Sequence, residues 1–370
     1  MFSGPRVVLV AFDGFPLQAI GPELTPNLLR LAESGGRAPE GGRSGLPSTT
    51  YPGSISLLTG CSRTVSGVRT TSRKRDAVPG WAGSDVSLVP TILHEAHDAG
   101  LPTAAVFGDH RLQRVAHLED EDWAWPAGGE VPNEIPVDAH GYPVNAAVLP
   151  HLLAAADDSE IALVYGHLNE TDTLGHDLGP NAPETLDCVR ATDRCLRLLM
   201  DALEPDWNRT IVIVTSDHDM EARVAADPID LSPALADGLI CDWIADASAA
   251  FARLAIGVDH DRAIAGLRRL DGIAGWRSYD PDMLLLLAAP GRVFAGQRVH
   301  AGGTHGNRST SRTLAIVGGG HPIASALGKA IDAAPPRLRD WAPTIAAILG
   351  VELPAADGDP IVESAIVALR

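Results

Sequence analysis

The sequence is poor in cysteine. Its 370 residues include four, Cys61, Cys188, Cys195 and Cys241, and none of them belongs to a Cys-x-x-Cys pair. So few and so scattered cysteines in a chain of this length exclude a disulfide-rich scaffold. We expect them to be reduced thiols that pack as small apolar side chains, in a cytoplasmic protein.

Long apolar runs are also missing. The run over residues 7–12 ends at Asp13, far short of the roughly 20 residues that a helix needs to cross a bilayer. Arg6 precedes this run, but the run is too short for a secretory signal and no small-residue cleavage site follows it. The sequence therefore predicts neither a membrane span nor a secretory signal.

Positive charge is scarce. The chain has 29 Lys and Arg against 47 Asp and Glu, which gives a formal net charge of −18. Nucleic acids and anionic membranes bind basic surfaces, so we expect neither a nucleic-acid polymer nor a membrane as a partner. With 45% hydrophobic residues and a mean hydropathy of +0.05, the chain can bury a sizeable core, which excludes wholesale disorder.

Apolar, β-branched runs alternate with stretches of helical pattern. Near-continuous apolar strands between helices are typical of a buried, largely parallel sheet. We therefore predict an α/β fold with a doubly wound, mostly parallel sheet, and Gly100 just after the end of one helix. The strand-like runs lie at residues 7–12, 103–107, 161–165, 210–215 and 313–317, and the helical stretches at 25–34, 89–99, 182–203 and 344–349.

Two stretches interrupt this alternation. Residues 108–150 are rich in Pro, Gly and charge and resemble a long surface excursion. From about residue 222 to 300 the pattern changes to a strand-like stretch at 239–256, a helix at 261–272 and a strand at 283–289. We interpret this second stretch as a compact inserted α+β cap. The predicted domains are thus a catalytic core of residues 1–221 and 301–370, and a cap of residues 222–300.

Polar residues follow four of the expected strands, where open α/β sheets bind their ligands. Taken singly, each could cap a helix or complete a turn, but four strand ends that carry only metal-ligand types are improbable by chance. Asp and neutral His suit zinc, and six such groups suit two ions roughly 3.5–4 Å apart. The six are three carboxylates and three imidazoles: Asp13, Asp172, His176, Asp217, His218 and His305.

A candidate nucleophile stands at the start of a helix. The segment over residues 46–54 leads into an apolar helical stretch, with Pro52 near its first turn and Thr50 just before. Thr50 could be a helix cap alone. A helix N-terminus also binds phosphate, however, and a hydroxyl there that faces two metals could lose its proton and attack phosphorus.

The combination of these motifs resembles the alkaline phosphatase superfamily, and most closely its nucleotide pyrophosphatase/phosphodiesterase branch. The resemblance runs from residue 7 to 355 in the family order. No Cys-x-Pro-x-Arg segment is present at the nucleophile, which argues against the sulfatase branch. The matching strings are Ala-Phe-Asp13-Gly, Thr25-Pro-Asn-Leu, Pro47-Ser-Thr-Thr50-Tyr-Pro, Asp172-Thr-Leu-Gly-His176, Ser216-Asp217-His218, Thr304-His305-Gly306 and Asp340-Trp-Ala-Pro-Thr344.

The resemblance implies roles for these residues. One zinc ion would be held by Asp172, His176 and His305, and the other by Asp13, Asp217 and His218. Thr50 would lie beside the metals as the nucleophile and form a phospho-threonine ester. Thr49 is the rival hydroxyl, but the family places its nucleophile directly before an aromatic residue and Pro, which selects Thr50.

The sequence departs from the family at two places. Phosphodiesterases carry an Asn about twenty residues after the nucleophile, and here Thr70 or Thr71 stands in that region. The same segment holds four cations, Arg69, Arg73, Lys74 and Arg75, which form either a solvated turn or an anion clamp. Gly53-Ser54 also replaces the usual Asn-His, a difference for which the sequence offers no account.

Other residues are candidates for substrate contact. Tyr51 corresponds to an aromatic residue that stacks on a nucleobase in relatives, and His167 stands where relatives often carry a second aromatic residue. Trp123 and Trp125 could wall the pocket, although each aromatic residue could equally pack in the core or a lid. The remaining histidines lack spacing that demands a metal, and among them His321 follows a strand end.

Three functions are consistent with these residues. The first is a two-zinc hydrolase that cleaves phosphodiester or pyrophosphate bonds in nucleotide-like small molecules. The second is a phosphomonoesterase or a phosphonoacetate-hydrolase-like enzyme on the same scaffold, which the basic run and the missing Asn favour. The third is a non-catalytic, metal-stabilised binding protein, which ranks last because no expected ligand or nucleophile is missing.

Overall fold

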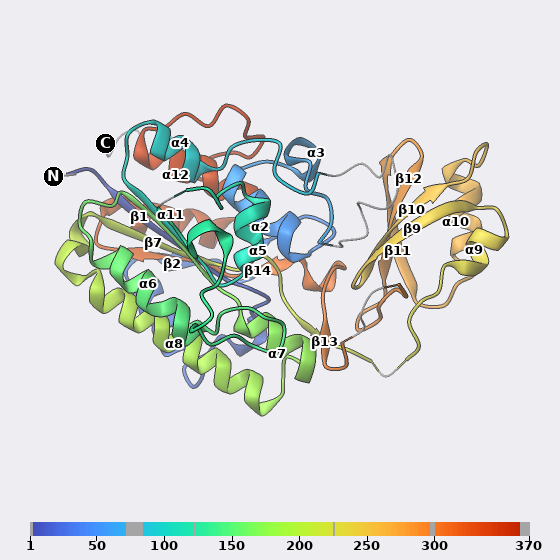
Figure 1. The fold of residues 1–370 in the computed structure, drawn as a ribbon, viewed down its shortest axis with the longest axis horizontal. Helices are drawn as coiled ribbons and strands as arrows, with labels where there is room; N and C mark the ends of the chain where they lie inside the picture. Colours follow the sequence, from blue (N-terminus) through green and yellow to red (C-terminus); the bar gives the residue numbers. More distant parts are fainter. Residues whose placement is uncertain (1–2, 72–83, 122, 225, 297–299, 363–370) are drawn as a thin grey trace.

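The computed structural model describes residues 3–71, 84–121, 123–224, 226–296 and 300–362. A seven-stranded sheet in the order β2-β15-β7-β1-β6-β4-β5 forms its centre (Figure 1). Parallel pairing joins β1 to β6 and β7, and β4 to β5 and β6, whereas β15 runs antiparallel to β7. The sheet is therefore mostly parallel, as predicted. The bounds are β1 (Arg6–Phe12), β2 (Gly36–Arg37), β4 (Thr103–Phe107), β5 (Ala124–Trp125), β6 (Leu163–Leu168), β7 (Thr210–Thr215) and β15 (Ala315–Gly319).

Helices cover both faces of this sheet. Alternate residues of a strand point to opposite faces, so Val7 and Leu9 enter one core while Val8 and Val10 enter another. The first core includes residues of α2 (Thr50–Thr59), α4 (Ile92–Asp98), α5 (His110–Val115), α11 (Pro322–Ala333) and α12 (Trp341–Leu349). The second includes residues of α1 (Pro26–Glu33), α6 (Asn145–Asp157) and α8 (Pro183–Ala202). Two buried faces account for the continuous apolar runs in the sequence.

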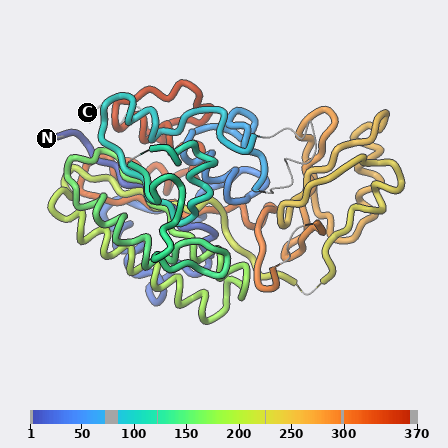
Figure 2. The backbone as a smooth tube through the Cα atoms, in the orientation of Figure 1, coloured from blue at the N-terminus to red at the C-terminus, as the bar shows by residue number. Residues whose placement is uncertain are grey.

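A second, smaller unit stands beside the sheet, drawn in yellow and orange in Figure 1 and followed as a tube in Figure 2. It is a four-stranded antiparallel sheet in the order β11-β12-β10-β9. This confirms the inserted α+β character of the fold. The stretch expected as one strand at 239–256 turns instead and forms a hairpin of two strands. The elements are α9 (Ser232–Ala236), β9 (Ile240–Asp246), β10 (Ala249–Leu254), α10 (His260–Leu267), β11 (Ile273–Asp280) and β12 (Met283–Ala288).

Short elements complete the chain and bring its distant parts together. Antiparallel pairing joins β8 (Glu221–Ala222) to β13 (Gly303–Thr304) and β3 (Gly42–Arg43) to β14 (Arg312–Thr313). Two further helices are α3 (Arg63–Ser66) and α7 (Glu170–Leu178). Short 3₁₀ helices lie at Leu17–Ala19, Ala127–Gly129, Glu204–Arg209, Ser309–Ser311 and Leu338–Asp340.

Several local predictions can be compared with the structure. Gly100 has a φ of +81° just after α4, the left-handed conformation that glycine provides at a helix end. The excursion at 108–150 is more ordered than expected, since it contains α5, β5 and the start of α6. All four cysteines are free thiols, and Cys241 alone among them is exposed. Within the described residues, no helix has the length and apolar composition needed to span a membrane.

Candidate metal centre

The six predicted ligand residues converge at one end of the central sheet. Asp13 directly follows β1, and Asp217 and His218 follow β7 after a single residue. The pairing of β8 with β13 then carries His305 back to His218, and their rings stack with centroids 3.7 Å apart. Asp172 and His176 lie one turn apart on α7, which follows β6. Parallel strands end at the same edge, so the topology alone assembles these groups.

Gly14 permits this convergence. Its φ is +55°, and a Cβ at this position would lie 2.6 Å from Asp172 Oδ1. A larger residue would therefore displace the Asp172 carboxylate as well as strain the turn. The sequence Asp13-Gly14 thus has a geometric reason: the glycine makes room for a ligand that comes from a different strand end.

One half of the cluster contains Asp13, Asp217 and His218. The Nε2 atom of His218 lies 3.5 Å from Asp13 Oδ1 and 3.3 Å from Asp217 Oδ2. All three side chains are at most 1% exposed. Their ligand atoms all lie within 4.8 Å of one another, close enough to surround one cation.

The other half contains Asp172, His176 and His305. Asp172 Oδ1 lies 3.6 Å from His176 Nε2 and 3.7 Å from His305 Nε2, and the two Nε2 atoms are 3.0 Å apart. The same Asp172 oxygen is 4.0 Å from His218 Nε2, so it connects the two halves. The group of ligand atoms near enough to hold one cation on this side consists of Asp172, His305 and the shared His218, and His176 lies beside it.

The backbone orients the three imidazole rings for metal binding. The Nδ1 atoms of His176, His218 and His305 lie within 3.3 Å of the carbonyl oxygens of Gly303, Asp219 and Ser48, respectively. A carbonyl can only accept a hydrogen bond, so each Nδ1 carries the proton. Each Nε2 then presents its lone pair to the cluster, which is the tautomer that a metal requires.

The carboxylates lack partners that would satisfy their buried oxygens. Among the described residues, both oxygens of Asp13, Oδ1 of Asp172 and Oδ2 of Asp217 are buried without a hydrogen-bond partner. Buried carboxylate oxygens are rarely left unsatisfied in native proteins. Three carboxylates with free oxygens, beside three imidazoles with free lone pairs, fit divalent cations in both number and chemistry.

Burial shifts the pKa of these groups toward their neutral forms. The pKa of Asp172 is raised to about 6 and that of Asp217 to about 7, mainly by burial. Burial and the neighbouring carboxylates of Asp217 and Asp172 raise the pKa of Asp13 well above its usual range. Burial lowers the pKa of His176 to about 4. A bound cation would reverse the effect on the carboxylates, because positive charge favours their ionised form.

Thr50 reaches this cluster and Thr49 does not. Thr50 is the first residue of α2, and its Oγ1 lies 3.2 Å from His218 Nε2. The Thr49 hydroxyl instead donates to Oδ2 of Asp246, at 3.1 Å. Of the two adjacent hydroxyls, the one that the family resemblance favours therefore lies beside the cluster, and the other does not.

A cavity of about 560 Å³ opens above the cluster. Tyr51 and Thr71 line it, whereas Thr70, Arg69 and His167 are not among the described lining residues. No Lys or Arg lies in the described part of the wall. The lining residues are Asp13, Thr50, Tyr51, Thr71, Asp109, His140, Tyr142, Asn169, Asp172, His176, Asp246, Ala247, Val293, Phe294, Gly296, His300, Gly303, Thr304 and His305.

Asp246, the last residue of β9, is a wall residue that sequence reasoning missed. Its Oδ2 accepts hydrogen bonds from Thr49 Oγ1, from Thr70 Oγ1 at 2.7 Å and from the Thr71 amide at 3.0 Å. These bonds hold the second sheet against Thr49, just before α2, and against the segment that follows α3. They also fix the backbone at Thr71, which lines the cavity. The Thr71 Oγ1 lies 3.2 Å from the Tyr51 amide nitrogen.

His167 lies beside the metal-ligand cluster, next to Asp13. Its Nδ1 accepts a hydrogen bond from the Asp109 amide, so Nε2 carries the proton and lies 3.2 Å from Asp13 Oδ2. Burial lowers the pKa of His167 to about 3, which keeps the ring neutral. The residue is fully buried, and its contact is with a metal-ligand candidate.

Arg69 points to the second sheet. Its guanidinium lies 2.6 Å from Asp280 Oδ2 and 5.0 Å from the centre of the Tyr279 ring. The other three cations of the predicted basic run, Arg73, Lys74 and Arg75, lie outside the described residues.

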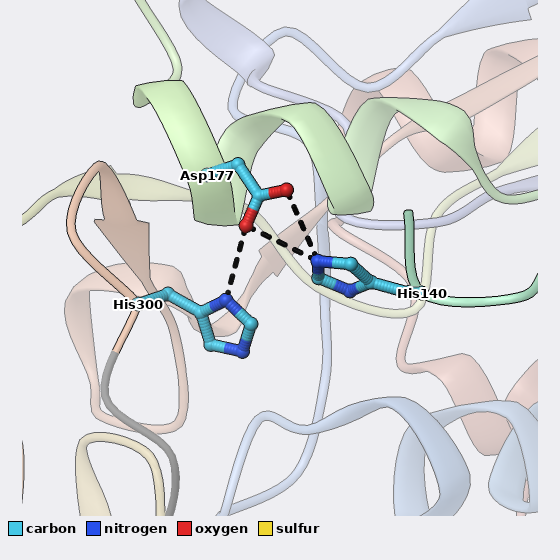
Figure 3. Close-up of side chains that lie close together, drawn as sticks. All are labelled: His140, Asp177 and His300. Atoms are coloured by element: carbon cyan, nitrogen blue, oxygen red, sulfur yellow. Dashed lines mark hydrogen bonds and ion pairs between the residues drawn. The ribbon is translucent and has the colours of Figure 1, made fainter. Parts of the chain in front are cut away.

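A histidine pair beside the cavity was also missed. Figure 3 shows His140, Asp177 and His300 close together. Both oxygens of Asp177 lie 3.1 Å from His140 Nε2, and its Oδ1 lies 3.2 Å from His300 Nδ1. The ligand atoms are near enough to hold a cation, but the Asp177 carboxylate is already satisfied by two imidazole N–H groups. The position of Asp177, directly after His176, was the available sequence signal.

The remaining aromatic and histidine candidates have structural roles. The rings of Trp123 and His97 stack with centroids 5.3 Å apart, and those of Trp125 and His151 with centroids 4.2 Å apart. His321 caps α11, since its Nδ1 accepts a hydrogen bond from the Ile323 amide.

Comparison with known proteins gives a consistent result. The model of the type I phosphodiesterase / nucleotide pyrophosphatase family matches residues 7–268. A segment of 86 residues is 32% identical to GPI ethanolamine phosphate transferase 3 of Schizosaccharomyces pombe. That match covers 23% of this chain and only 9% of the yeast protein.

Solved structures with the same fold include two that contain small ligands. Phosphonoacetate hydrolase of Sinorhizobium meliloti, in complex with phosphonoacetate, superposes with a TM-score of 0.71 at 20% identity, over 94% of this chain and 97% of that chain. An inactive form of murine ectonucleotide pyrophosphatase / phosphodiesterase 5, in complex with AMP, gives a TM-score of 0.68 at 16% identity, over 96% and 97%. The superpositions establish a shared fold, and at identities this low they establish nothing more.

Proposed function

Because this chain belongs to the type I phosphodiesterase / nucleotide pyrophosphatase family, we propose that it hydrolyses phosphodiester or pyrophosphate bonds in nucleotide-like small molecules. The reaction would use two divalent metal ions, with zinc as the expected metal, and Thr50 as the nucleophile. One observation carries the proposal: the Thr50 hydroxyl lies 3.2 Å from a ring nitrogen of His218 in a cluster of unsatisfied carboxylates.

We propose the division of ligands that the family resemblance implies. One ion would be held by Asp172, His176 and His305, and the other by Asp13, Asp217, His218 and Thr50. When bound, two such ions would neutralise phosphate oxygens and favour the ionised Thr50 hydroxyl.

The chain's own residues account for the covalent steps. The Thr50 hydroxyl would lose its proton to solvent, and its oxygen would attack phosphorus. The bond from phosphorus to the leaving-group oxygen would break, and that oxygen would depart with the electron pair and take a proton from solvent. Water would then cleave the phospho-threonine ester and restore the hydroxyl. The Thr71 hydroxyl, which accepts from the Tyr51 amide and lines the cavity, has a free O–H to donate to a phosphate oxygen.

The cavity wall favours a substrate of low charge. A diester carries one negative charge, and the described wall offers no Lys or Arg for a second. Tyr51 and Tyr142 provide aromatic surfaces on which a nucleobase could stack. His140 and His300 donate their N–H groups to Asp177, so their second nitrogens can accept from hydroxyl or amino groups of the substrate.

The second candidate is a monoesterase or a phosphonoacetate-hydrolase-like enzyme, which a threonine in place of the Asn favours. The third is a metal-stabilised binding protein. We further propose that residues 222–300 act as a cap that supplies Asp246, and that the free buried thiols reflect a reducing, cytoplasmic location.

The test is the ratio of kcat/KM for bis(p-nitrophenyl) phosphate to that for p-nitrophenyl phosphate with zinc-loaded protein. We expect a clear preference for the diester. A preference for the monoester would favour the second candidate, and zinc binding without activity on either ester or on phosphonoacetate would favour the third.

A further inference from the structure

A second cavity, of about 440 Å³, is also lined by α2, through Ser56, whereas Thr50 and Tyr51 of this helix line the first. The two linings share no described residue. Five arginines line the second cavity, and within the described residues no Asp or Glu does. This is unusual in a protein with a net charge of −18. The lining residues are Arg43, Ser44, Gly45, Leu46, Ser56, Ser62, Arg63, Thr64, Arg277, Tyr279, Arg337, Leu338 and Arg339.

Three of these lining residues also have polar atoms that are buried and unsatisfied. In the described part of the chain, Nε and Nη2 of Arg63, Oγ of Ser44 and Oη of Tyr279 are all buried without a hydrogen-bond partner. Arg63 is only 7% exposed. Every one of these groups can donate a hydrogen bond, so together they form a set of donors that has no acceptor.

Arg63 has no ion-pair partner among the described residues, and the Asp246 carboxylate compensates its charge only at longer range. Burial lowers its pKa to about 10, so the guanidinium is still protonated at neutral pH. Arg337 pairs with Asp340 and Asp359, and Arg339 pairs with Asp357. Within the described residues, no carboxylate forms an ion pair with Arg43, Arg63 or Arg277. A buried, unpaired cation is strongly unfavourable unless a partner joins it.

The backbone makes room for this guanidinium. A Cβ on Gly45 would lie 2.1 Å from Arg63 Nη1, so a larger residue at this position would displace the guanidinium from its place. Arg63 begins α3 directly after the loop that ends α2. The site is thus built from residues 43–64, from β11 and from residues 337–339, three parts of the chain that are distant in sequence.

We propose that this cavity is a second ligand site, which binds the phosphoryl group of a phosphorylated small molecule or free phosphate. A phosphoryl dianion offers three acceptor oxygens, and arginine binds it with two parallel hydrogen bonds. Arg63 would contact it from the interior, Arg277 from the exposed side, and Ser44 and Tyr279 would supply hydroxyl donors.

The site adjoins the nucleophile helix. Ser56 lines it from α2, the helix that begins at Thr50. Leu46 lines it two residues before Ser48, whose carbonyl accepts from the metal-ligand candidate His305. An anion bound there would stabilise the segment that carries the candidate nucleophile, without entering the catalytic cavity.

Calorimetric titration of inorganic phosphate into zinc-loaded protein tests this proposal. Wild-type protein should show two binding events, one at the metal centre and one at the second cavity. Arg63→Met should weaken the second event at least about tenfold, since hydrogen bonds to a charged group contribute roughly 1.5–3 kcal/mol. Asp217→Asn should remove the first event and retain the second. Arg190→Gln, which alters an exposed ion pair on α8, should keep both.

Two further arms keep the result decisive. Arg277→Gln changes an exposed residue and should also weaken the second event, which separates loss of the site from misfolding of Arg63→Met. AMP in place of phosphate distinguishes a nucleotide from free phosphate as the source of the phosphoryl group. An Arg63→Met isotherm that retains both events would overturn the proposal, as would a wild-type isotherm with a single event that Asp217→Asn removes. Thr50→Ala should still show the second binding event, even when this variant has lost hydrolysis.

Discussion

The Thr50 hydroxyl lies 3.2 Å from Nε2 of His218, the ring nitrogen whose lone pair faces the metal-ligand cluster. The distance brings together the start of α2 and the end of β7, which are separated by 168 positions in the chain. Under the proposed function, a cation bound at this cluster would favour the ionised hydroxyl, which could then attack phosphorus.

Replacement of Thr50 by Ala should therefore abolish turnover while bound zinc stays near the wild-type amount. The expected loss is at least about 10³-fold in kcat, because the nucleophile is absent. Thr49→Ala is the matched control: its hydroxyl contacts Asp246, so most activity should remain. Steady-state kinetics and metal analysis of both variants make the comparison, and loss of turnover in Thr49→Ala alone would assign the nucleophile to Thr49.

Asp217→Asn should lower both metal content and activity. Its Oδ1 accepts hydrogen bonds from the Gly14 and His218 amides, which an asparagine oxygen can retain, whereas its Oδ2 has no described partner and is the proposed metal ligand. Asp177→Asn provides the comparison, because that carboxylate is already satisfied by His140 and His300. Mass spectrometry under native conditions should count two ions in wild type and in Asp177→Asn. Three ions in wild type, with one lost in Asp177→Asn, would make the histidine pair a metal site.

The Thr71 hydroxyl should matter for catalysis more than that of Thr70. Thr71→Ala removes a donor at the cavity, and loss of one such donor reduces kcat roughly 10²- to 10³-fold. Thr71→Ser keeps the hydroxyl and should retain most activity. Kinetics on bis(p-nitrophenyl) phosphate measure both variants. Equal activity of Thr71→Ala and wild type would remove this residue from the phosphate site.

Arg69→Ala tests the predicted anion clamp. The guanidinium now binds Asp280, so a clamp would require it to exchange that partner for substrate. If the clamp operates, kcat/KM for p-nitrophenyl phosphate should fall more than that for the diester. Since Arg69 is outside the described cavity wall, we expect Arg69→Ala to have the same kinetic constants as wild type on each of the two substrates. Its effect should be confined to the contact with the second sheet.

The metal-free protein should lose stability as pH rises from about 6.5 to 8. Burial raises the pKa of Asp217 to about 7 and that of Asp13 further above its usual range. Such a group binds more protons in the folded than in the unfolded state, so its contribution to the free energy of unfolding falls as pH passes the folded pKa.

The cluster histidines, whose pKa values are lowered, have the opposite effect, but that effect is complete above about pH 6.5. The melting temperature of chelator-treated protein should therefore fall over this interval. Zinc-loaded protein should melt higher and lose less, because cations keep the carboxylates ionised. A melting temperature that rises with pH in the chelated sample would show that the buried carboxylates do not hold protons in the folded state.

The sequence predicts the sheet and the convergence of the candidate ligand residues for one physical reason. Buried parallel strands produce continuous apolar runs, and their ends meet at one edge, so Asp13 and Asp217 can be placed together without a structure. The sequence cannot choose between Thr70 and Thr71, because the choice depends on which backbone group contacts Asp246.

Residues joined only by tertiary contacts were beyond sequence reasoning. Asp246 belongs to a hairpin of the second sheet, and nothing near it in the chain marks it as part of the wall. His140 and His300 are 160 positions apart and meet through Asp177. Arg63 carries no signal in the sequence, and its burial becomes evident only once the fold places Gly45 and Tyr279 beside it.

The catalytic cavity takes its floor and its wall from different parts of the molecule. The ends of the central sheet supply the metal-ligand cluster, and the β9–β10 hairpin supplies Asp246 and Ala247. Natural selection can therefore act on them separately. Mutations in the hairpin that retain Asp246, such as those at Ala247, would change which molecules are admitted, while the reaction chemistry is inherited intact. Descendants of such a gene can acquire new substrates before they lose catalysis, so relatives should differ more in the hairpin than at the strand ends.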